Sequence, residues 1–214
     1  PSGTGGSPMA RLLLLPDISA VGSFAGAYDS YDVEALSPRT GPFGPEGKPT
    51  PLFQEIELGL QSVVDPYARA DIFISFGPGE VAVEEAYLTS LGLPAGLQLR
   101  AGQLFSPFGR QNQQHPHVWE FVDAPLAQGR LVATEVLSGP GLDVAWLAPL
   151  PWFVELHLAG QGTAPTPTAE GGEDPGERLT LVARVLQYFS LGEATTLGAG
   201  ISAAVGLPTG TVMC

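Results

Sequence analysis

The sequence predicts an all-β chain, an antiparallel up-and-down meander of the type that builds transmembrane β-barrels. Three observations support this fold class. Apolar and polar residues alternate with a period of two along most of the chain, the composition is short of charge, and long connections alternate with short ones. A period of two indicates β-strands with one apolar and one polar face.

The composition favours strands that expose one face to lipid. Hydrophobic residues make up 44% of the 214 residues and charged residues only 14%, and the mean hydropathy is +0.16. Soluble domains usually carry about 25% charged residues. No run approaches the roughly 18 to 20 consecutive apolar residues of a membrane helix, and an apolar excess without such runs is typical of barrel strands. A charge-poor soluble β-sandwich is the alternative.

Residues 1–10 are rich in Gly and Ser, and residues 1–15 are expected to be disordered, whereas residues 16–214 are expected to form the barrel domain. The strand at 55–61 has the clearest pattern, since Ile56, Leu58 and Leu60 oppose Glu55 and Glu57. Nine strands are expected in all, at about residues 18–27, 55–61, 68–76, 81–89, 97–102, 142–148, 152–158, 179–185 and 196–205.

Turn-forming residues separate these strands. Tight connections are expected at 65–66, 77–79, 94–96 and 149–151, where Pro fixes φ and Gly adopts conformations closed to other residues. The connections after the first, fifth and seventh strands are long, and those after the second, fourth, sixth and eighth are short. Only the short link after the third strand departs from this alternation. Outer-membrane barrels have this asymmetry between their two edges.

The strand at 81–89 departs from strict alternation. Glu84 and Glu85 interrupt the pattern, which predicts a β-bulge at this point. Adjacent residues of a regular strand face opposite sides, so the two carboxylates are not expected to act as a pair.

The odd number of strands predicts an incomplete barrel. Single-chain bacterial barrels have an even number of strands, and residues 206–214 are too few to cross a bilayer of about 30 Å. The chain is therefore expected to be a fragment of a barrel, with an open, curled sheet and apolar side chains on its convex face.

Charged residues on the polar faces are candidates for lining a pore. A lipid-facing charge near the middle of a bilayer costs about 2–4 kcal/mol, so these side chains are expected to face inward. Acidic residues outnumber basic ones in this set, which favours cations as solutes. The alternative is that they form salt bridges that stiffen the wall, and both can hold together. The candidates are Glu55, Glu57, Arg69, Asp71, Arg100, Asp143, Glu155, His157 and Arg184.

The segment from Ser106 to Pro140 is expected to fold inward and narrow the pore. The candidates for this constriction are Arg110, Asn112, Gln114 and Trp119. The same segment offers a second interpretation, because imidazole and carboxylate both suit zinc. The candidate metal ligands are His115, His117, Glu120 and Asp123, although the proline between the two histidines restricts both neighbours.

Two stretches resemble a known family. VDPYARADIFISF and VAVEEAYLTSLGLPAGLQLRAGQLFSPFGRQNQQHPHVWEFVDAPL are similar to bacterial outer-membrane barrels described as zinc-regulated TonB-dependent outer-membrane receptors, and to porins of the phosphate-selective type. The resemblance covers about Pro16 to Gly160. It implies a barrel in the outer membrane of a Gram-negative bacterium more than it implies active transport, since no plug or energy-coupling box precedes Pro16 and the chain lacks a terminal aromatic residue.

Other partners and activities are not expected. A net charge of −13 argues against nucleic acid, which requires clustered Lys and Arg. Ser106, His115 and Asp123 have the residue types of a catalytic triad, but no nucleophile-elbow motif surrounds the serine, so no enzymatic activity is expected. The expected function is a channel for small hydrophilic solutes in outer-membrane lipid, with homo-oligomerisation left open. The alternatives are an uptake receptor for a metal ion or complex such as zinc, and a soluble all-β binding protein.

Overall fold

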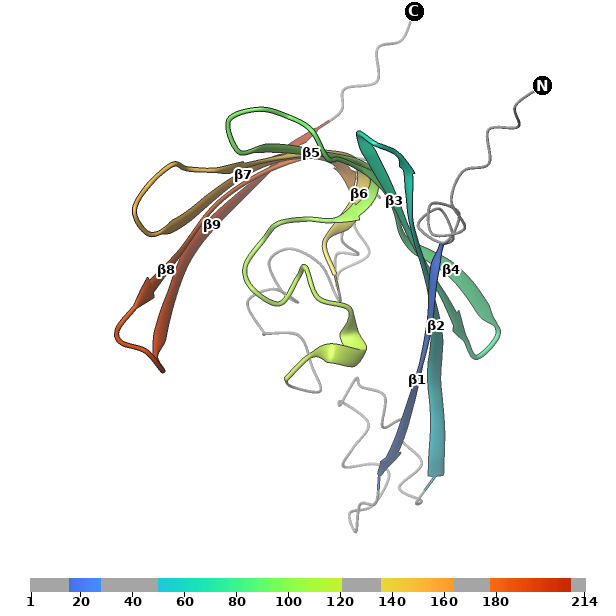
Figure 1. Ribbon diagram of the computed structural model, residues 1–214. Helices are drawn as coiled ribbons and strands as arrows, with labels where there is room; N and C mark the ends of the chain where they lie inside the picture. Colours follow the sequence, from blue (N-terminus) through green and yellow to red (C-terminus); the bar gives the residue numbers. More distant parts are fainter. Residues whose placement is uncertain (1–15, 28–49, 121–135, 164–177, 209–214) are drawn as a thin grey trace, which may run out of the picture.

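The computed structural model describes residues 16–27, 50–120, 136–163 and 178–208. These residues form one sheet of nine strands in which each strand pairs with its neighbour in the sequence (Figure 1). The predicted antiparallel meander is therefore confirmed, and the expectation for residues 1–15 lies outside the described residues. The elements are β1 (Asp17–Ala27), β2 (Thr50–Asp65), β3 (Ala68–Gly77), β4 (Glu80–Ser90), β5 (Leu97–Phe105), the 3-10 helix η1 (Pro116–Val118), β6 (Ser138–Leu147), β7 (Phe153–Thr163), β8 (Arg178–Ser190) and β9 (Thr196–Pro208).

The connections follow the predicted alternation, with the expected exception of the short link from β3 to β4, which lies at the edge of the long connections. The strands β2 and β3 are joined by a tight turn in which the Asp65 carboxylate accepts the backbone N–H of Tyr67 at 2.7 Å. Tight connections also join β4 to β5, β6 to β7 and β8 to β9, whereas long ones follow β1, β5 and β7. Because successive strands are antiparallel, these four short turns lie at one edge of the sheet and the three long connections at the other.

The sheet is open and strongly curved. Within the described residues, β1 pairs with β2 alone and β9 with β8 alone, so each leaves one edge unpaired. Figure 1 shows the sheet bending around a hollow, with β1 and β2 on one side and β8 and β9 on the other. The segment that follows β5 lies inside this hollow.

Burial on the two faces is the reverse of that in a soluble sheet. On β6, Asp143 is 0% exposed, whereas its neighbours Leu142 and Val144 are 54% and 40% exposed. The convex face thus carries exposed apolar side chains and the concave face buried polar ones. The buried polar residues of the strands are Glu57, Asp71, Ser75, Glu85, Thr89, Asp143, His157, Gln161, Thr180 and Arg184.

The concave face also holds a small apolar cluster. Leu137, Ala159 and Val182 are buried against one another, and Phe108 packs against them. Phe108 comes from the segment after β5, so this cluster helps to hold that segment against β7 and β8. Among the described residues, no helix is long and apolar enough to cross a membrane.

Candidate functional site

The segment 106–120 is fixed to the concave face near its start by one amide. Asn112 is 0% exposed, and its Nδ2 donates to the carbonyl oxygens of Ser106 and Leu137 at 2.9 Å each. Its Oδ1 accepts the N–H of Leu137 at 2.7 Å. Asn112 therefore joins the chain that leaves β5 to the chain that enters β6. It is one of the predicted constriction residues.

Further contacts connect the segment to the strands at the far side of the hollow. Ser106 Oγ donates to Gln161 Oε1 of β7, and the N–H of Gly109 donates to Ser202 Oγ of β9 at 3.0 Å. Arg184 of β8 donates to Gln113 Oε1. The segment is thus bound to three consecutive strands on this side.

On the other side of the hollow, His115 enters a group of carboxylates. Its Nδ1 lies 2.9 Å from Glu84 Oε2 and 2.7 Å from Glu57 Oε2. Its Nε2 lies 3.1 Å from Glu85 Oε2. Phe73 and Phe105 flank the imidazole, with ring centroids 4.7 and 4.9 Å away.

A bulge in β4 brings the two adjacent glutamates to the same ring. Phe73 pairs with Glu85 and Ile74 with Val83, so Glu84 is the extra residue of β4. The predicted bulge is confirmed, but the expectation that Glu84 and Glu85 cannot act together was wrong. In a bulge two residues oppose one on the partner strand, and the strict reversal of sides is lost.

The surroundings of His115 favour its charged form. Burial by itself lowers the pKa of the imidazole, but contacts with Glu57, Glu84 and Glu85 outweigh burial and raise the pKa from 6.5 to about 11. In the absence of another cation, a protonated His115 therefore neutralises part of the carboxylate charge that β2 and β4 place in the wall.

His117 lies beside this group. Its Nδ1 is 3.5 Å from Glu57 Oε2 and 3.9 Å from Glu55 Oε1, and the two imidazole centroids are 5.8 Å apart. Both Glu57 Oε2 and His117 Nδ1 are buried without a hydrogen bond. Glu57 Oε2 lacks a hydrogen bond although His115 Nδ1 is close. This nitrogen carries a single hydrogen, and its hydrogen bond goes to Glu84.

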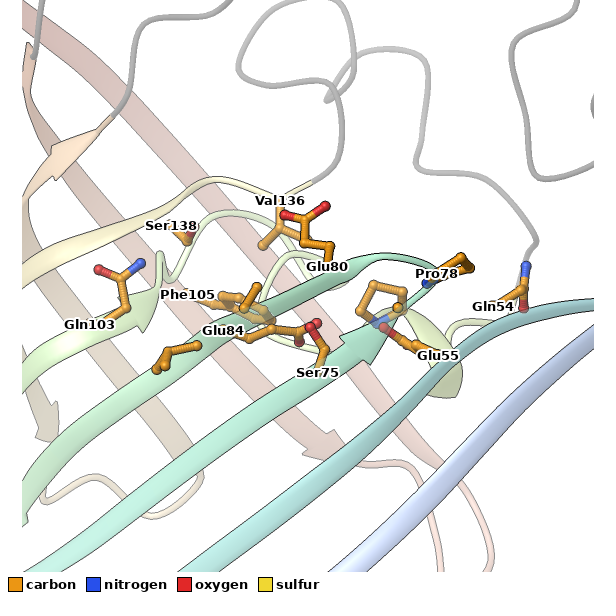
Figure 2. A pocket seen from close by; sticks show the side chains of 14 residues that line it. Gln54, Glu55, Ser75, Pro78, Glu80, Glu84, Gln103, Phe105, Val136 and Ser138 are labelled. Carbon is orange, nitrogen blue, oxygen red and sulfur yellow. The ribbon is translucent and has the colours of Figure 1, made fainter.

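A cavity of about 590 Å³ opens beside the carboxylates. Glu55, Ser75 and Glu84 line it from β2, β3 and β4, and Phe105 and Pro116 line it from β5 and the segment that follows (Figure 2). The cavity therefore offers small polar species a route to Glu84.

A second polar group occupies the concave face near the short turns. Arg100 of β5 donates to Asp143 Oδ2 of β6 at 2.6 and 3.0 Å. His157 of β7 lies 3.2 Å from both oxygens of Asp143 and 2.6 Å from Glu155 Oε1. A cavity of about 210 Å³ adjoins this group and reaches Arg69, whose Nε pairs with Asp71 at 2.9 Å.

The sequence-derived candidates thus fall into distinct groups. The nine pore-lining candidates share the concave face, and many of them are joined in ion pairs. Of the proposed metal ligands, Glu120 lies away from the histidines in an exposed pair with Arg110 at 2.9 Å, and Asp123 lies outside the described residues. Among the constriction candidates, Trp119 Nε1 donates to the carbonyl of Gln114 at 2.8 Å.

Sequence reasoning missed Glu84 and Glu85 as partners of His115. The break in alternation that predicted the bulge could have indicated them, because a bulge changes the direction in which neighbouring side chains point. Glu57 was expected on the inner face, but its neighbour in space is 58 positions further along the chain, and no local pattern links the two.

One comparison with known proteins finds a relative. A stretch of 100 residues is 45% identical to a protein of Aquifex aeolicus (strain VF5) that is described as "Uncharacterized protein". The stretch makes up 47% of this chain and 21% of that protein, so the match spans about a fifth of the relative's length. No family model matches the chain, and no solved structure matches it.

Proposed function

We propose that this chain forms part of the wall of an outer-membrane β-barrel channel that passes small hydrophilic solutes in a Gram-negative bacterium. The observation that carries this proposal is the reversed burial of the sheet. Polar and charged side chains are buried on the concave face, and large apolar side chains are exposed on the convex face. Barrels in lipid have this arrangement, with a polar interior and an apolar outer band.

The exposed apolar side chains give the proposal its energetic basis. Leu142, Leu158 and Ile201 are 54%, 64% and 74% exposed. Complete burial of one such side chain is worth about 1.5–3 kcal/mol, and a sheet that displays many of them in water forgoes this stabilisation. Contact with lipid acyl chains supplies it. A soluble all-β protein would instead direct the same residues into a core.

Aromatic residues support the same orientation. Tyr67, Trp146, Trp152 and Tyr188 lie near the short turns and are 36–73% exposed. Trp and Tyr are enriched where a membrane meets water, because one part of each ring system is apolar and another is polar. These four residues are suited to an interfacial belt at the edge of the short turns.

The segment 106–120 is suited to act as a constriction. It lies inside the hollow of the sheet (Figure 1), and its contacts reach β2 and β4 on one side and β7, β8 and β9 on the other. Carboxylates outnumber arginines on the concave face, which favours cations over anions as solutes. An uptake receptor for a metal ion is the second candidate, favoured by the histidine and glutamate group, and it should stay closed without a partner.

Reconstitution of the chain in lipid vesicles tests the proposal. In variants that retain a single tryptophan, brominated acyl chains should quench the fluorescence of Trp146, which is on the convex face, and should leave Trp119 unquenched. Planar-bilayer recordings should then show cation-selective conductance. A chain that stays monomeric in buffer without detergent and shows no quenching of Trp146 would contradict the membrane assignment. Quenching without conductance would favour the receptor.

A further inference from the structure

We infer that Glu57, Glu84 and His115 bind a divalent transition-metal ion of the zinc class, which fixes the segment 106–120 to the wall formed by β2 and β4. One ligand atom from each of the three residues lies within 4.8 Å of those of the other two. An imidazole nitrogen with two carboxylate oxygens is a donor set that suits zinc, whereas calcium and magnesium prefer oxygen alone.

The spacing of the donor atoms fits a small ion. His115 Nδ1 lies 2.7 Å from Glu57 Oε2 and 2.9 Å from Glu84 Oε2. In a tetrahedral zinc site with bonds of about 2.0–2.1 Å, the ligand atoms are roughly 3.3–3.5 Å apart. A zinc ion can therefore take the place of the hydrogen between these atoms if each of the two separations widens by about half an ångström.

A polar atom that lacks a hydrogen bond provides an independent indication of a ligand. Glu57 is 5% exposed, and its Oε2 is buried without a hydrogen bond. His117 Nδ1 is also buried without one, and it lies 3.5 Å from that same Glu57 oxygen. His117 lies beside the proposed site and outside it, because among the described residues the ligand atoms that all lie within 4.8 Å of one another come from Glu57, Glu84 and His115 alone. A buried polar atom without a hydrogen bond is costly, and a metal ion bound by Glu57 would satisfy its Oε2.

The remaining nitrogen of His115 is held as it is in metal sites. Nε2 lies 3.1 Å from Glu85 Oε2, and Glu85 in turn accepts the N–H of Phe105 at 2.8 Å through its other oxygen. A metal-binding histidine commonly donates its second N–H to a carboxylate, which fixes the tautomer and the orientation of the ring. Glu85 is thus positioned to present Nδ1 to the metal.

The charge of the group also favours a divalent cation. Four glutamates, at positions 55, 57, 84 and 85, are in ion-pair contact with two histidines, and no Lys or Arg takes part in the ion pairs of these glutamates within the described residues. Two negative charges therefore remain even when both imidazoles are protonated. Glu84 lines the cavity of about 590 Å³, which gives the ion a path of entry. The depth at which Glu57 is buried favours a resident ion over a transported one.

A zinc titration of the full chain tests the inference. The parent should carry Cys214→Ser, which removes the single thiol of the chain as a competing ligand. Calorimetry in detergent micelles should show one zinc ion bound per chain. Glu57→Gln and Glu84→Gln should each lower the zinc affinity about 100-fold or more, and Glu85→Gln about 10- to 100-fold. Glu120→Gln, a matched change at a glutamate near the histidines in sequence but paired with Arg110, should leave it unchanged.

X-ray absorption of the zinc-loaded parent provides a readout that does not depend on how the variants fold. It should show only nitrogen and oxygen neighbours at about 2.0–2.2 Å, with the outer-shell scattering of at least one imidazole. Absence of zinc binding, absence of imidazole scattering, equal loss in Glu120→Gln, or equal affinity for calcium would each overturn the inference. None of these outcomes bears on lipid contact at the convex face, so failure here is distinguishable from failure of the channel proposal.

Discussion

Glu84 and Glu85 are adjacent in the chain and contact opposite nitrogens of one imidazole, Glu84 at Nδ1 and Glu85 at Nε2 of His115. A single extra residue in β4 makes this possible, because a regular strand would send one of the two carboxylates to the convex face. Because of the bulge, two consecutive glutamates of β4 contact both nitrogens of His115, which belongs to the segment 106–120.

The first prediction concerns that ring. Replacing His115 with leucine should lower the free energy of unfolding of the metal-free chain by about 3–5 kcal/mol, because the buried carboxylates lose the cation that compensates them. Denaturant unfolding in micelles measures the change. Val118→Ala is the control, since Val118 is 55% exposed in the same segment, and it should have little effect. A His115→Leu chain as stable as the parent would show that the carboxylates do not depend on the imidazole.

Much of the fold could be predicted because strand alternation is a local property of the sequence. The apolar positions of β3 and β6 face one side because neighbouring residues in each strand must face opposite sides, and charges such as Asp143 lie on the other side. Local sequence also predicted the turn at Asp65, where a proline follows the aspartate, and the bulge at Glu84, where two glutamates are consecutive.

The candidate site could be predicted only in part, because its partners are distant in sequence. His115 is 31 positions from Glu84, and no local pattern encodes that contact. Sequence reasoning therefore chose Glu120 and Asp123, the acidic residues nearest to the histidines along the chain. The segment instead folds back onto the wall, which already contains carboxylates, while Glu120 remains near the surface with Arg110.

The second prediction compares two arginines of the concave face. The Arg100 side chain is 18% exposed and pairs with Asp143, whose side chain is 0% exposed. Arg100→Leu should lower the free energy of unfolding by about 2–3 kcal/mol, somewhat less than the typical cost of breaking a buried pair, because His157 still contacts Asp143. Arg69 is 44% exposed, and Gln61 Nε2 donates to its buried partner Asp71 at 2.9 Å with or without the arginine, so Arg69→Leu should cost less than Arg100→Leu. Equal losses in the two unfolding curves would contradict this ranking.

The third prediction concerns a close approach between β6 and β7. A Cβ at Gly141 would collide with the carbonyl oxygen of Gly160 and would lie 2.7 Å from Gln161 Cα. Gln161 also donates to the carbonyl of Leu104 at 2.8 Å and holds Ser106, so Gly141→Ala should loosen the start of the segment 106–120 as well as the sheet.

Protease cleavage of the folded chain measures that loosening. Gly141→Ala should be cleaved faster than the parent in the segment 106–120 and should unfold at lower denaturant concentration. Gly162→Ala is the matched control, because a Cβ there meets nothing closer than 3.8 Å. Cleavage of both variants at the rate of the parent would show that β7 can move away from β6 without cost.

The last prediction separates the two faces of β6 with one pair of neighbours. Val144 is 40% exposed on the convex face, and Ala145 lines the cavity of about 210 Å³ on the concave face with Glu155 and His157. If the convex face contacts lipid, Val144→Arg should destabilise the vesicle-inserted chain by about 2–4 kcal/mol, the cost of an arginine near the middle of a bilayer. Ala145→Arg places the same charge in a polar cavity beside a carboxylate and should be nearly neutral. In a soluble sheet the penalty at position 144 disappears, because an arginine at this exposed position meets water, and Val144→Arg should then cost no more than Ala145→Arg. The free energies of unfolding of Val144→Arg and Ala145→Arg, both measured in vesicles, therefore show whether the convex face contacts lipid.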